Sequence, residues 1–219
     1  SNDLKRSPRF IVVEGPIGVG KTSLARRLAA SLSGEVILEQ VDENPFLERF
    51  YRSGRSAALP AQLFFLFNRA RQMEVFRQSD LFATVRVADF HLDKDRLFAE
   101  LNLDREELEL YKQISARLDI ESPVPDLVVY LQAPTGVLIE RLRRRPADPE
   151  RTTADPGEAY LRELNEAYQH FFFHYTATSL LVVEGSQFRP QNDDEALDDL
   201  IKQIKTMGRG TRYYVPRTQ

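Results

Sequence analysis

The residues with the clearest chemical signature lie between Gly15 and Thr22. Their sequence, GPIGVGKT, matches the pattern GxxxxGK[ST], in which glycines let successive backbone N–H groups turn inward around a phosphate anion. A helix that follows such a loop adds its positive N-terminal end to the same anion. In this pattern Lys21 reaches the outer phosphates and Thr22 supplies a hydroxyl to Mg²⁺. The sequence therefore predicts a nucleotide-binding loop formed by Gly15, Pro16, Ile17, Gly18, Val19, Gly20, Lys21 and Thr22.

The flanking segments decide whether this stretch is a phosphate-binding loop or only a glycine-rich turn before a helix. Residues 11–13 are a continuous apolar run, which is typical of a parallel strand covered on both faces. Residues 23–32 have the pattern of a helix that ends near Gly34. Because the loop pattern requires a strand before it and a helix after it, we favour the phosphate-binding interpretation.

Two carboxylates follow later strand patterns. Glu39 ends a second predicted strand at 36–39, and Asp89 lies near the end of a third at 84–90. Ligands of open α/β sheets bind at the carboxyl ends of the strands, so both carboxylates are candidate site residues. Asp89 is a candidate ligand of Mg²⁺ or of its water, a role that acidic residues on neighbouring strands have in phosphate-loop proteins. The alternatives are a solvated loop carboxylate for Glu39 and a helix N-cap for Asp89.

A long helix is predicted over residues 61–78. Most of its apolar and aromatic residues follow helical spacing, so they are expected in a core rather than against a ligand. Gln62 and Arg69 are seven residues apart and therefore share one face. If that face borders the site, both side chains can hydrogen-bond a heterocycle. Otherwise they are solvated, which composition alone favours.

Arginines are concentrated after a helix predicted at 135–144, for which Thr135 is the expected cap. Such a run is usually a solvated helix end. Beside a triphosphate, however, mobile arginines can stabilise the charge that develops in phosphoryl transfer. We therefore expect an arginine-rich lid at about residues 143–155, with contributions from Arg141, Arg143, Arg144, Arg145 and Arg151.

Composition excludes several classes of protein. A formal net charge of −3 argues against a generally basic nucleic-acid binder, and the lack of cysteine excludes disulfides, thiolate metal sites and a cysteine nucleophile. No apolar run approaches the roughly 20 residues that a membrane span needs. His170 and His174 are four residues apart, but with no third ligand beside them packing is favoured over metal binding. A reducing cytoplasm is compatible with these features.

Five apolar strand patterns alternate with helical patterns, and there is no internal repeat. This alternation predicts an α/β fold with three layers, in which helices flank a five-stranded parallel sheet. A length of 219 residues suits one domain over residues 1–219. The basic, aromatic tail at about 208–219 is expected either to be disordered or to dock on the body or on a partner. The remaining strand patterns are at 126–131 and 180–184, and the remaining helical ones at 44–51, 93–102, 104–118, 157–175 and 193–207.

A phosphate loop by itself indicates a nucleotide rather than a reaction. A GTPase is disfavoured because the chain has no NKxD sequence and no DxxG after the third strand. Over nearly all of its length the chain resembles the deoxynucleoside kinase family. The resemblance is carried by the loop with SLARRLA after it, by the arginine-rich segment followed by EAYLRELNEAY, by Glu39, and by Tyr51, Gln62 and Arg69 at the family's spacing.

The resemblance implies a P-loop NTPase fold and an ATP- and Mg²⁺-dependent enzyme of nucleotide salvage. Such an enzyme transfers the γ-phosphoryl group of ATP to the 5′-hydroxyl of a deoxynucleoside. Glu39 is implied to accept the hydroxyl proton, Gln62 to make two hydrogen bonds to the base, and Arg69 to lie near the base. Tyr51 and Glu150 are implied to bind the 3′-hydroxyl.

Lys21, Mg²⁺ and the lid arginines are expected to hold the γ-phosphoryl group, with Arg141, Arg143 and Arg145 as the candidates in the lid. The family resemblance also implies a homodimer formed through helices and a cytoplasmic location. The expected partners are ATP and a deoxynucleoside, with neither nucleic acid nor a membrane.

One departure concerns the residues after the third strand, where the family usually has an acidic residue followed by arginine and serine. This chain has Asp89, Phe90 and His91 there. A phenylalanine cannot replace a guanidinium, so either Arg86, Arg96 or a lid arginine substitutes, or the phosphate is handled differently. The base-facing aspartate of many relatives corresponds to Asp95 if a one-residue gap is allowed, and to Lys94 otherwise. The FFLFNRARQ stretch favours a purine deoxynucleoside, particularly deoxyadenosine.

Two other functions remain open from the sequence. A nucleoside monophosphate kinase such as thymidylate kinase also has a loop and a lid, but Glu39 would repel the acceptor's phosphate. A nucleotide-binding module that does not transfer phosphate is suggested by the missing arginine after Asp89 and by the aromatic, basic tail.

Overall fold

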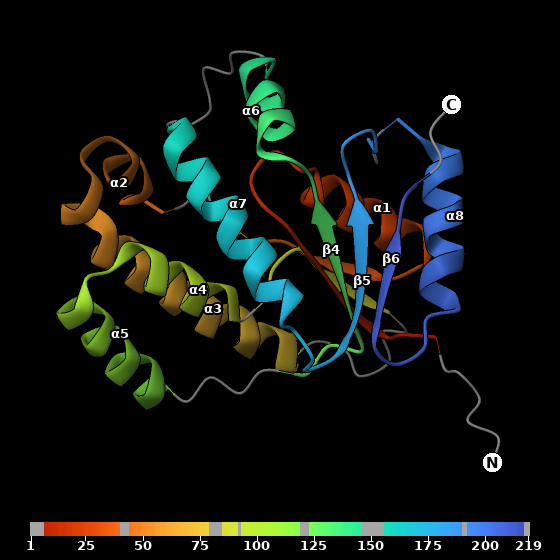
Figure 1. Cartoon of the computed structure of the whole chain (residues 1–219). Coiled ribbons are helices and arrows are strands. Elements are labelled where there is room, and N and C mark those ends of the chain that lie inside the picture. The colour runs from red at the N-terminus through yellow and green to blue at the C-terminus, as the bar shows by residue number, and fades with distance from the viewer. Residues whose placement is uncertain are drawn as a thin grey trace.

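The computed structural model describes residues 7–39, 44–78, 85–91, 93–118, 123–145, 156–189 and 192–216 (Figure 1). The strands are β1 (Phe10–Glu14), β2 (Glu35–Ile37), β3 (Arg86–Ala88), β4 (Leu127–Gln132), β5 (Ser179–Glu184) and β6 (Thr211–Tyr214). The helices are α1 (Lys21–Ser31), α2 (Leu47–Ser53), α3 (Ala58–Gln78), α4 (Asp93–Asn102), α5 (Arg105–Leu118), α6 (Thr135–Arg143), α7 (Glu158–Phe173) and α8 (Asp194–Lys205), with a 3₁₀ turn at Gly54–Ala57. The strands form one parallel sheet in the order β2-β3-β1-β4-β5-β6, which confirms the predicted fold class.

Helices cover both faces of the sheet, and this explains why the strands are continuous apolar runs. Ile11 and Val13 of β1 pack into one core with α1 and α8. Val12, between them, packs on the opposite face with Tyr168 and Phe172 of α7. Neighbouring residues of a strand point to opposite faces, so one apolar run serves two cores. Figure 1 shows α1 and α8 on one side of the sheet and α7 on the other.

The loop after β1 requires glycine at three positions. Gly18 and Gly20 have φ angles of 88° and 94°, a conformation that residues with a Cβ atom rarely adopt. A Cβ atom on Gly15 would lie 2.7 Å from the carbonyl oxygen of Leu131 in β4. The glycines of the predicted phosphate-binding loop are therefore required by the backbone itself, and α1 begins at Lys21 directly after them.

The sheet has a sixth strand that the sequence did not predict, and it lies in the tail. Strand β6 pairs in parallel with β5, with Arg212 opposite Leu181 and Tyr214 opposite Val183. Tyr214 packs against the core that contains α1 and α8, whereas the side chain of Tyr213 is 70% exposed. Of the two alternatives for the tail, docking on the body is thus correct for the described residues up to 216.

A third, smaller core lies among α3, α4 and α5, beyond the edge of the sheet. Helix α3 begins at Ala58, three residues before the predicted start, because the 3₁₀ turn at Gly54–Ala57 leads directly into it. This core presents the inner faces of α3 and α4 to the carboxyl ends of the strands. Its buried members are Ala58, Leu66, Ala99, Leu103 and Tyr111.

Two helix starts show how local hydrogen bonds agree with or override the sequence pattern. Asp104 caps α5, since its carboxylate accepts from the Glu107 backbone N–H at 2.8 Å and the Glu107 side chain accepts from the Asp104 N–H at 3.3 Å. The prediction that Thr135 caps α6 is wrong. Pro134 occupies the cap position, and the Thr135 hydroxyl instead accepts a hydrogen bond from Asn165 of α7.

Membrane-spanning helices and clusters of metal ligands are both absent from the described parts of the chain. No helix there is both long and apolar enough to cross a membrane. In the same ranges, no group of three or more His, Asp or Glu side chains is arranged to hold a metal ion. His170 and His174 are exposed and lie beside each other, with ring centroids 4.7 Å apart and ring planes tilted by 59°, so they are not part of the core as the packing interpretation assumed.

Candidate active site

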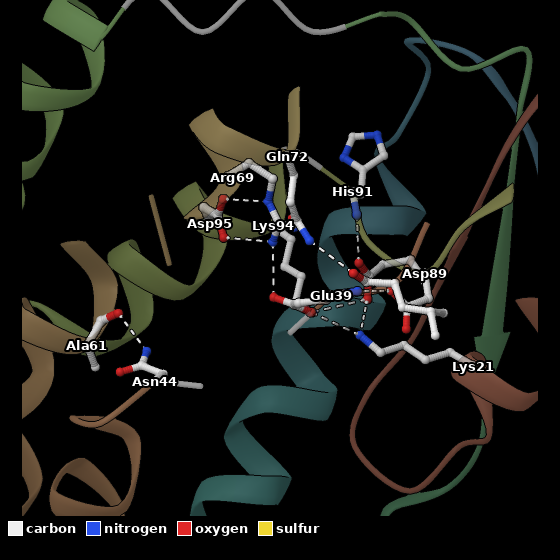
Figure 2. Close-up of polar contacts among 12 residues, drawn as sticks. Lys21, Glu39, Asn44, Ala61, Arg69, Gln72, Asp89, His91, Lys94 and Asp95 are labelled. Atoms are coloured by element: carbon white, nitrogen blue, oxygen red, sulfur yellow. Dashed lines mark hydrogen bonds and ion pairs between the residues drawn. The ribbon is translucent and has the colours of Figure 1, made fainter. Parts of the chain in front are cut away.

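Glu39 lies after β2 and is the centre of a buried cluster of charges (Figure 2). Its side chain is 7% exposed. One carboxylate oxygen accepts from Arg69 Nη2 at 3.0 Å, and the other accepts from Lys94 Nζ at 2.7 Å. The Lys21 ammonium of the phosphate-binding loop is 3.8 Å from the second oxygen. Burial alone would raise the pKa of Glu39, but Lys94, Arg69 and Lys21 outweigh burial and hold that pKa well below its usual range.

Asp89 connects this carboxylate to the phosphate-binding loop. One of its oxygens accepts from the Thr22 hydroxyl at 2.8 Å, and the other accepts from the Glu39 backbone N–H at 2.7 Å. A threonine hydroxyl and a carboxylate are hard oxygen donors of the kind that Mg²⁺ prefers. Mg²⁺ keeps several waters and takes its remaining ligands from substrate phosphates, so one protein carboxylate suffices. The Thr22–Asp89 pair therefore fits the predicted metal position.

Glu14 is a member of the site that sequence reasoning missed. It is the last residue of β1 and is 1% exposed. Its carboxylate accepts from the Gly15 N–H at 2.9 Å, the His91 N–H at 2.9 Å and the Tyr168 hydroxyl at 3.0 Å, and it lies 3.4 Å from Lys21 Nζ. Burial raises the pKa of Glu14, but Lys21, Lys94 and the Gly15 N–H lower it below its ordinary value. A charged residue that ends an apolar strand just before the loop was the available signal.

Arg69 of α3 is held on several sides at once. Its side chain is 2% exposed and is bound by Asp95 at 3.0 and 3.3 Å as well as by Glu39. Its Nη1 donates to Gln72 Oε1 at 3.0 Å, and the guanidinium lies over the ring of Phe90 at 4.0 Å. Burial lowers the pKa of Arg69, but Asp95 and Glu39 raise it further, so the group stays charged. The ring of Phe90 thus supports the guanidinium of Arg69 from α3.

The arginines expected to substitute after Asp89 lie elsewhere. Arg86 lies over the ring of Phe76 at 4.4 Å and donates to the Phe76 carbonyl oxygen. Arg96 pairs with Glu100 on the surface of α4. Among the described residues, the cations that contact Glu39 are instead Arg69, Lys94 and Lys21 of the loop. The one-residue ambiguity between Lys94 and Asp95 also has a structural answer, because Asp95 binds Arg69 and Lys94 binds Glu39.

Helix α3 carries a buried polar group that has no hydrogen-bond partner among the described residues. Gln62 is 3% exposed, and its side-chain oxygen has no hydrogen-bond partner among the described residues. A buried amide oxygen without a partner is costly, and a bound base can supply the missing donor. The ring of Tyr51 packs near Phe50 and Tyr160, and its hydroxyl lies within electrostatic reach of Lys94 and Glu39, while burial raises its pKa. Tyr51 thus lies close enough to Glu39 for the two side chains to interact electrostatically.

The predicted lid arginines have different surroundings. Arg141 donates to the carbonyl oxygens of Gly185 at 2.6 Å and Ser186 at 2.9 Å, which fixes it to the segment after β5. Arg143 pairs with Glu158 at the start of α7, and Arg145 is exposed. Glu150, Arg151 and the rest of the lid from residue 146 to 155 lie outside the described residues.

These contacts place a carboxylate beside the lysine of a phosphate-binding loop, at the carboxyl edge of a parallel sheet. A donor phosphate can bind the loop on one side of Lys21 while a hydroxyl faces Glu39 on the other, which is the arrangement that phosphoryl transfer needs. The fold and the site therefore define a phosphotransferase of the phosphate-loop class.

Comparison with known proteins identifies the family. Residues 11–208 match the family model described as deoxynucleoside kinase, so the chain belongs to the deoxynucleoside kinase family. It is 34% identical over 163 residues to the deoxyguanosine kinase of Bacillus subtilis (strain 168), an alignment that covers 73% of this chain and 76% of that protein. It is 26% identical over 207 residues to the deoxyadenosine/deoxycytidine kinase of the same organism, which covers 90% of this chain and 92% of that protein.

A solved structure shows the same fold. The deoxyadenosine kinase from M. mycoides with bound dATP superposes with a TM-score of 0.70 at 23% identity, over 89% of this chain and 97% of that chain. Membership of the family makes this protein a nucleotide-binding kinase of nucleotide salvage that acts on a hydroxyl acceptor.

Proposed function

We propose that the protein is an ATP- and Mg²⁺-dependent deoxynucleoside kinase that phosphorylates the 5′-hydroxyl of a purine deoxynucleoside. The observation that carries this proposal is the position of Glu39, whose carboxylate is 3.8 Å from Lys21 of the phosphate-binding loop and is fixed by Arg69 and Lys94. A carboxylate held so close to the phosphate-binding lysine can present an acceptor hydroxyl in line with the γ-phosphate.

In the proposed reaction a bond forms between the 5′-oxygen and the γ-phosphorus while the bond to the β,γ-bridging oxygen breaks, and ADP leaves. The proton of the hydroxyl passes to Glu39. The low pKa of Glu39 makes it a weak base, which suits a loose transition state in which the hydroxyl loses its proton late. Glu39 therefore acts first as the acceptor that orients the hydroxyl and only later as the proton acceptor.

Thr22 and Asp89 would hold Mg²⁺, which neutralises charge on the β- and γ-phosphates when it is bound. Asp89 has a second task in this scheme. Because its other oxygen accepts from the Glu39 backbone N–H at 2.7 Å, the metal position and the acceptor carboxylate are coupled through one side chain. The lid at about residues 143–155, with Arg143 and Arg145 at its start, would close over the phosphates, and Arg141 would position the segment after β5.

The base would bind at Gln62, whose unpartnered oxygen needs a donor. An amide can pair with adenine through N6–H and a ring nitrogen, or with guanine through N1–H and O6 after the amide turns over. Gln62 therefore favours a base with such an edge without separating the two purines. We propose deoxyadenosine as the preferred acceptor on the FFLFNRARQ stretch of α3, with Asp95 and Arg69 facing the base.

The sugar would be read by its 3′-hydroxyl, which Tyr51 and Glu150 would bind. We also propose that the protein is a cytoplasmic homodimer formed through helices. Light scattering at micromolar concentration tests the homodimer, and a monomeric mass would contradict it.

The test of the proposed function is ADP production from Mg·ATP with the four deoxynucleosides, their ribonucleoside counterparts and the four deoxynucleoside monophosphates. We expect turnover on purine deoxynucleosides, and a decrease in kcat of about 10²–10⁴-fold in Glu39→Gln. Glu35→Gln, at an exposed carboxylate that begins β2, is the matched control. Turnover only on monophosphates would favour the function named for one 23%-identical relative, the probable thymidylate kinase of Picrophilus torridus. ATP binding without consumption of any acceptor would indicate a non-catalytic module.

A further inference from the structure

Lys94 occupies a position that is unfavourable for a lysine unless other groups compensate its charge. It is the second residue of α4, near the positive end of the helix dipole, where cations are destabilising. It is also 8% exposed, and lysine is seldom buried to this extent without paired charges. Two unfavourable terms therefore act on the same ammonium group.

The compensation comes from two carboxylates that follow two different strands. Lys94 Nζ lies 2.7 Å from Glu39 Oε2 and 3.9 Å from Glu14 Oε1, and it sits 5.5 Å from the ring of Phe98. Figure 2 shows its side chain extending toward Glu39. Burial lowers the pKa of Lys94, but Glu14 and Glu39 raise it well above the ordinary value, so the ammonium stays protonated.

The other two cations of the cluster already have partners or an expected role. Arg69 is bound by Asp95, Gln72 and Glu39, and its guanidinium lies over the ring of Phe90, so it is fixed in place. Lys21 belongs to the loop that binds the donor phosphates. Lys94 has three N–H donors and a single contact at hydrogen-bond distance, to Glu39, among the described residues. It can therefore donate to an oxygen that arrives beside Glu39.

We propose that Lys94 is a catalytic residue that contacts the acceptor oxygen and the phosphoryl group in transfer. This inference rests on the proposed function. Lys94 would supply from α4 the positive charge that the resemblance places directly after the acidic residue of the third strand, where this chain has Phe90. An ammonium that donates to both Glu39 and the transferring group would hold the hydroxyl in line and stabilise the charge that develops on the phosphoryl oxygens.

The chain offers an unusually clean test, because it contains no cysteine. In Lys94→Cys, alkylation with 2-bromoethylamine in denaturant followed by refolding would restore an ammonium on a side chain of nearly the same length at that position alone. Lys112→Cys, at an exposed lysine of α5, treated in the same way is the matched control. Lys94→Met and Lys112→Met remove the charge at the two positions without alkylation.

We expect kcat for the best deoxynucleoside to fall about 10²–10³-fold in Lys94→Met and in unmodified Lys94→Cys, with KM for ATP within about threefold of the parent. Alkylation of Lys94→Cys should recover kcat by at least about tenfold, and the Lys112 variants should keep the parental kcat. A role in folding alone would lower the melting temperature and the amount of active protein without this selective loss and recovery of kcat.

Two results would overturn the inference. One is a kcat within threefold of the parent in folded Lys94→Met. The other is alkylated Lys94→Cys that refolds and binds ATP but stays as slow as the unmodified variant. If the parent protein itself phosphorylates no nucleoside, the proposed function fails first, and that outcome is read from the parent alone.

Discussion

Arg69 and the arginines at the end of α6 have opposite surroundings. Arg69, on the acceptor side, is 2% exposed and is bound by three side chains while it lies on an aromatic ring. Arg143 and Arg144, at the end of α6, are 71% and 72% exposed and each pairs with one glutamate. The guanidinium group is therefore fixed by its neighbours at Arg69 and solvated at Arg143 and Arg144.

The difference shows how rigidity is divided between the two sides of the site. A buried ion pair that loses one partner leaves an uncompensated charge, so Arg69 cannot move without a large penalty. Exposed pairs contribute about 0–1 kcal/mol and can exchange partners easily. The acceptor side is thus organised before substrate binds, whereas the arginines at the lid can leave their glutamates when phosphate arrives.

Arg69→Met should cause the largest loss of stability. It leaves Asp95 and Glu39 with one buried cation fewer, so we expect the free energy of unfolding to fall by about 3–5 kcal/mol. Urea unfolding followed by circular dichroism measures this. A loss below about 1 kcal/mol would show that the cluster is solvated and would remove the contrast with the lid.

Glu14→Gln should cost about 2–4 kcal/mol at neutral pH, because it removes a buried charge that two lysines and three hydrogen-bond donors face. The folded pKa of Glu14 lies below its ordinary value of 4.5, so its contribution is present above about pH 4.5 and is lost as the pH falls. The difference in the free energy of unfolding between the parent and Glu14→Gln should therefore become smaller in acid. Urea unfolding between pH 4 and 7 measures it, with the exposed Glu35→Gln as control, and a gap that is constant with pH would contradict the assignment.

Phe90→Leu tests the ring beneath Arg69. Both Phe90 and Phe188 are fully buried, but Phe188 belongs to the core with α1 and α8. We expect Phe90→Leu to cost about 1–2 kcal/mol more than Phe188→Leu, since only the first removes a desolvated cation–π contact. Equal losses of stability in the two variants, measured by thermal unfolding, would mean that the Phe90 ring contributes only packing.

Arg143→Gln should have the smallest effect on stability, below about 1 kcal/mol, because its pair with Glu158 is exposed. Its kcat should nevertheless fall by roughly tenfold if it moves onto the transferred phosphoryl group. Parallel measurement of unfolding and turnover separates the two roles. An unchanged kcat would assign Arg143 to the surface alone.

The elements of the sheet were largely predictable because buried parallel strands are short apolar runs. The five predicted strands are present, with ends shifted by a few residues. Strand β6 was missed because TRYY alternates exposed and half-buried residues over only four positions in a basic tail, so its pairing with β5 decides its conformation. Thr135 was misassigned as a cap because Asn165, thirty residues later, competes for its hydroxyl.

The site was predictable where a pattern is local and unpredictable where charges meet from distant segments. The loop and the pair of Gln62 and Arg69 follow from fixed spacing, although their roles are still proposals. Glu14 was missed although a charge at the end of an apolar strand was a signal for it. Lys94 could not be assigned, since its importance comes from contacts with Glu14 and Glu39 that no spacing encodes. Opposite charges in a buried cluster become visible only when the chain has folded.

The position of β1 in the middle of the sheet has a consequence for how the protein is made. Val12 has Ala88 on one side and Val128 on the other, so the strand that carries the phosphate-binding loop is synthesised well before β4, one of its two partners in the sheet. At about 5–20 residues per second, this apolar strand waits on the order of ten seconds for β4. Slow translation or a shortage of chaperones during that interval would leave β1 exposed for longer. It would favour aggregation of the nascent chain before the site has formed.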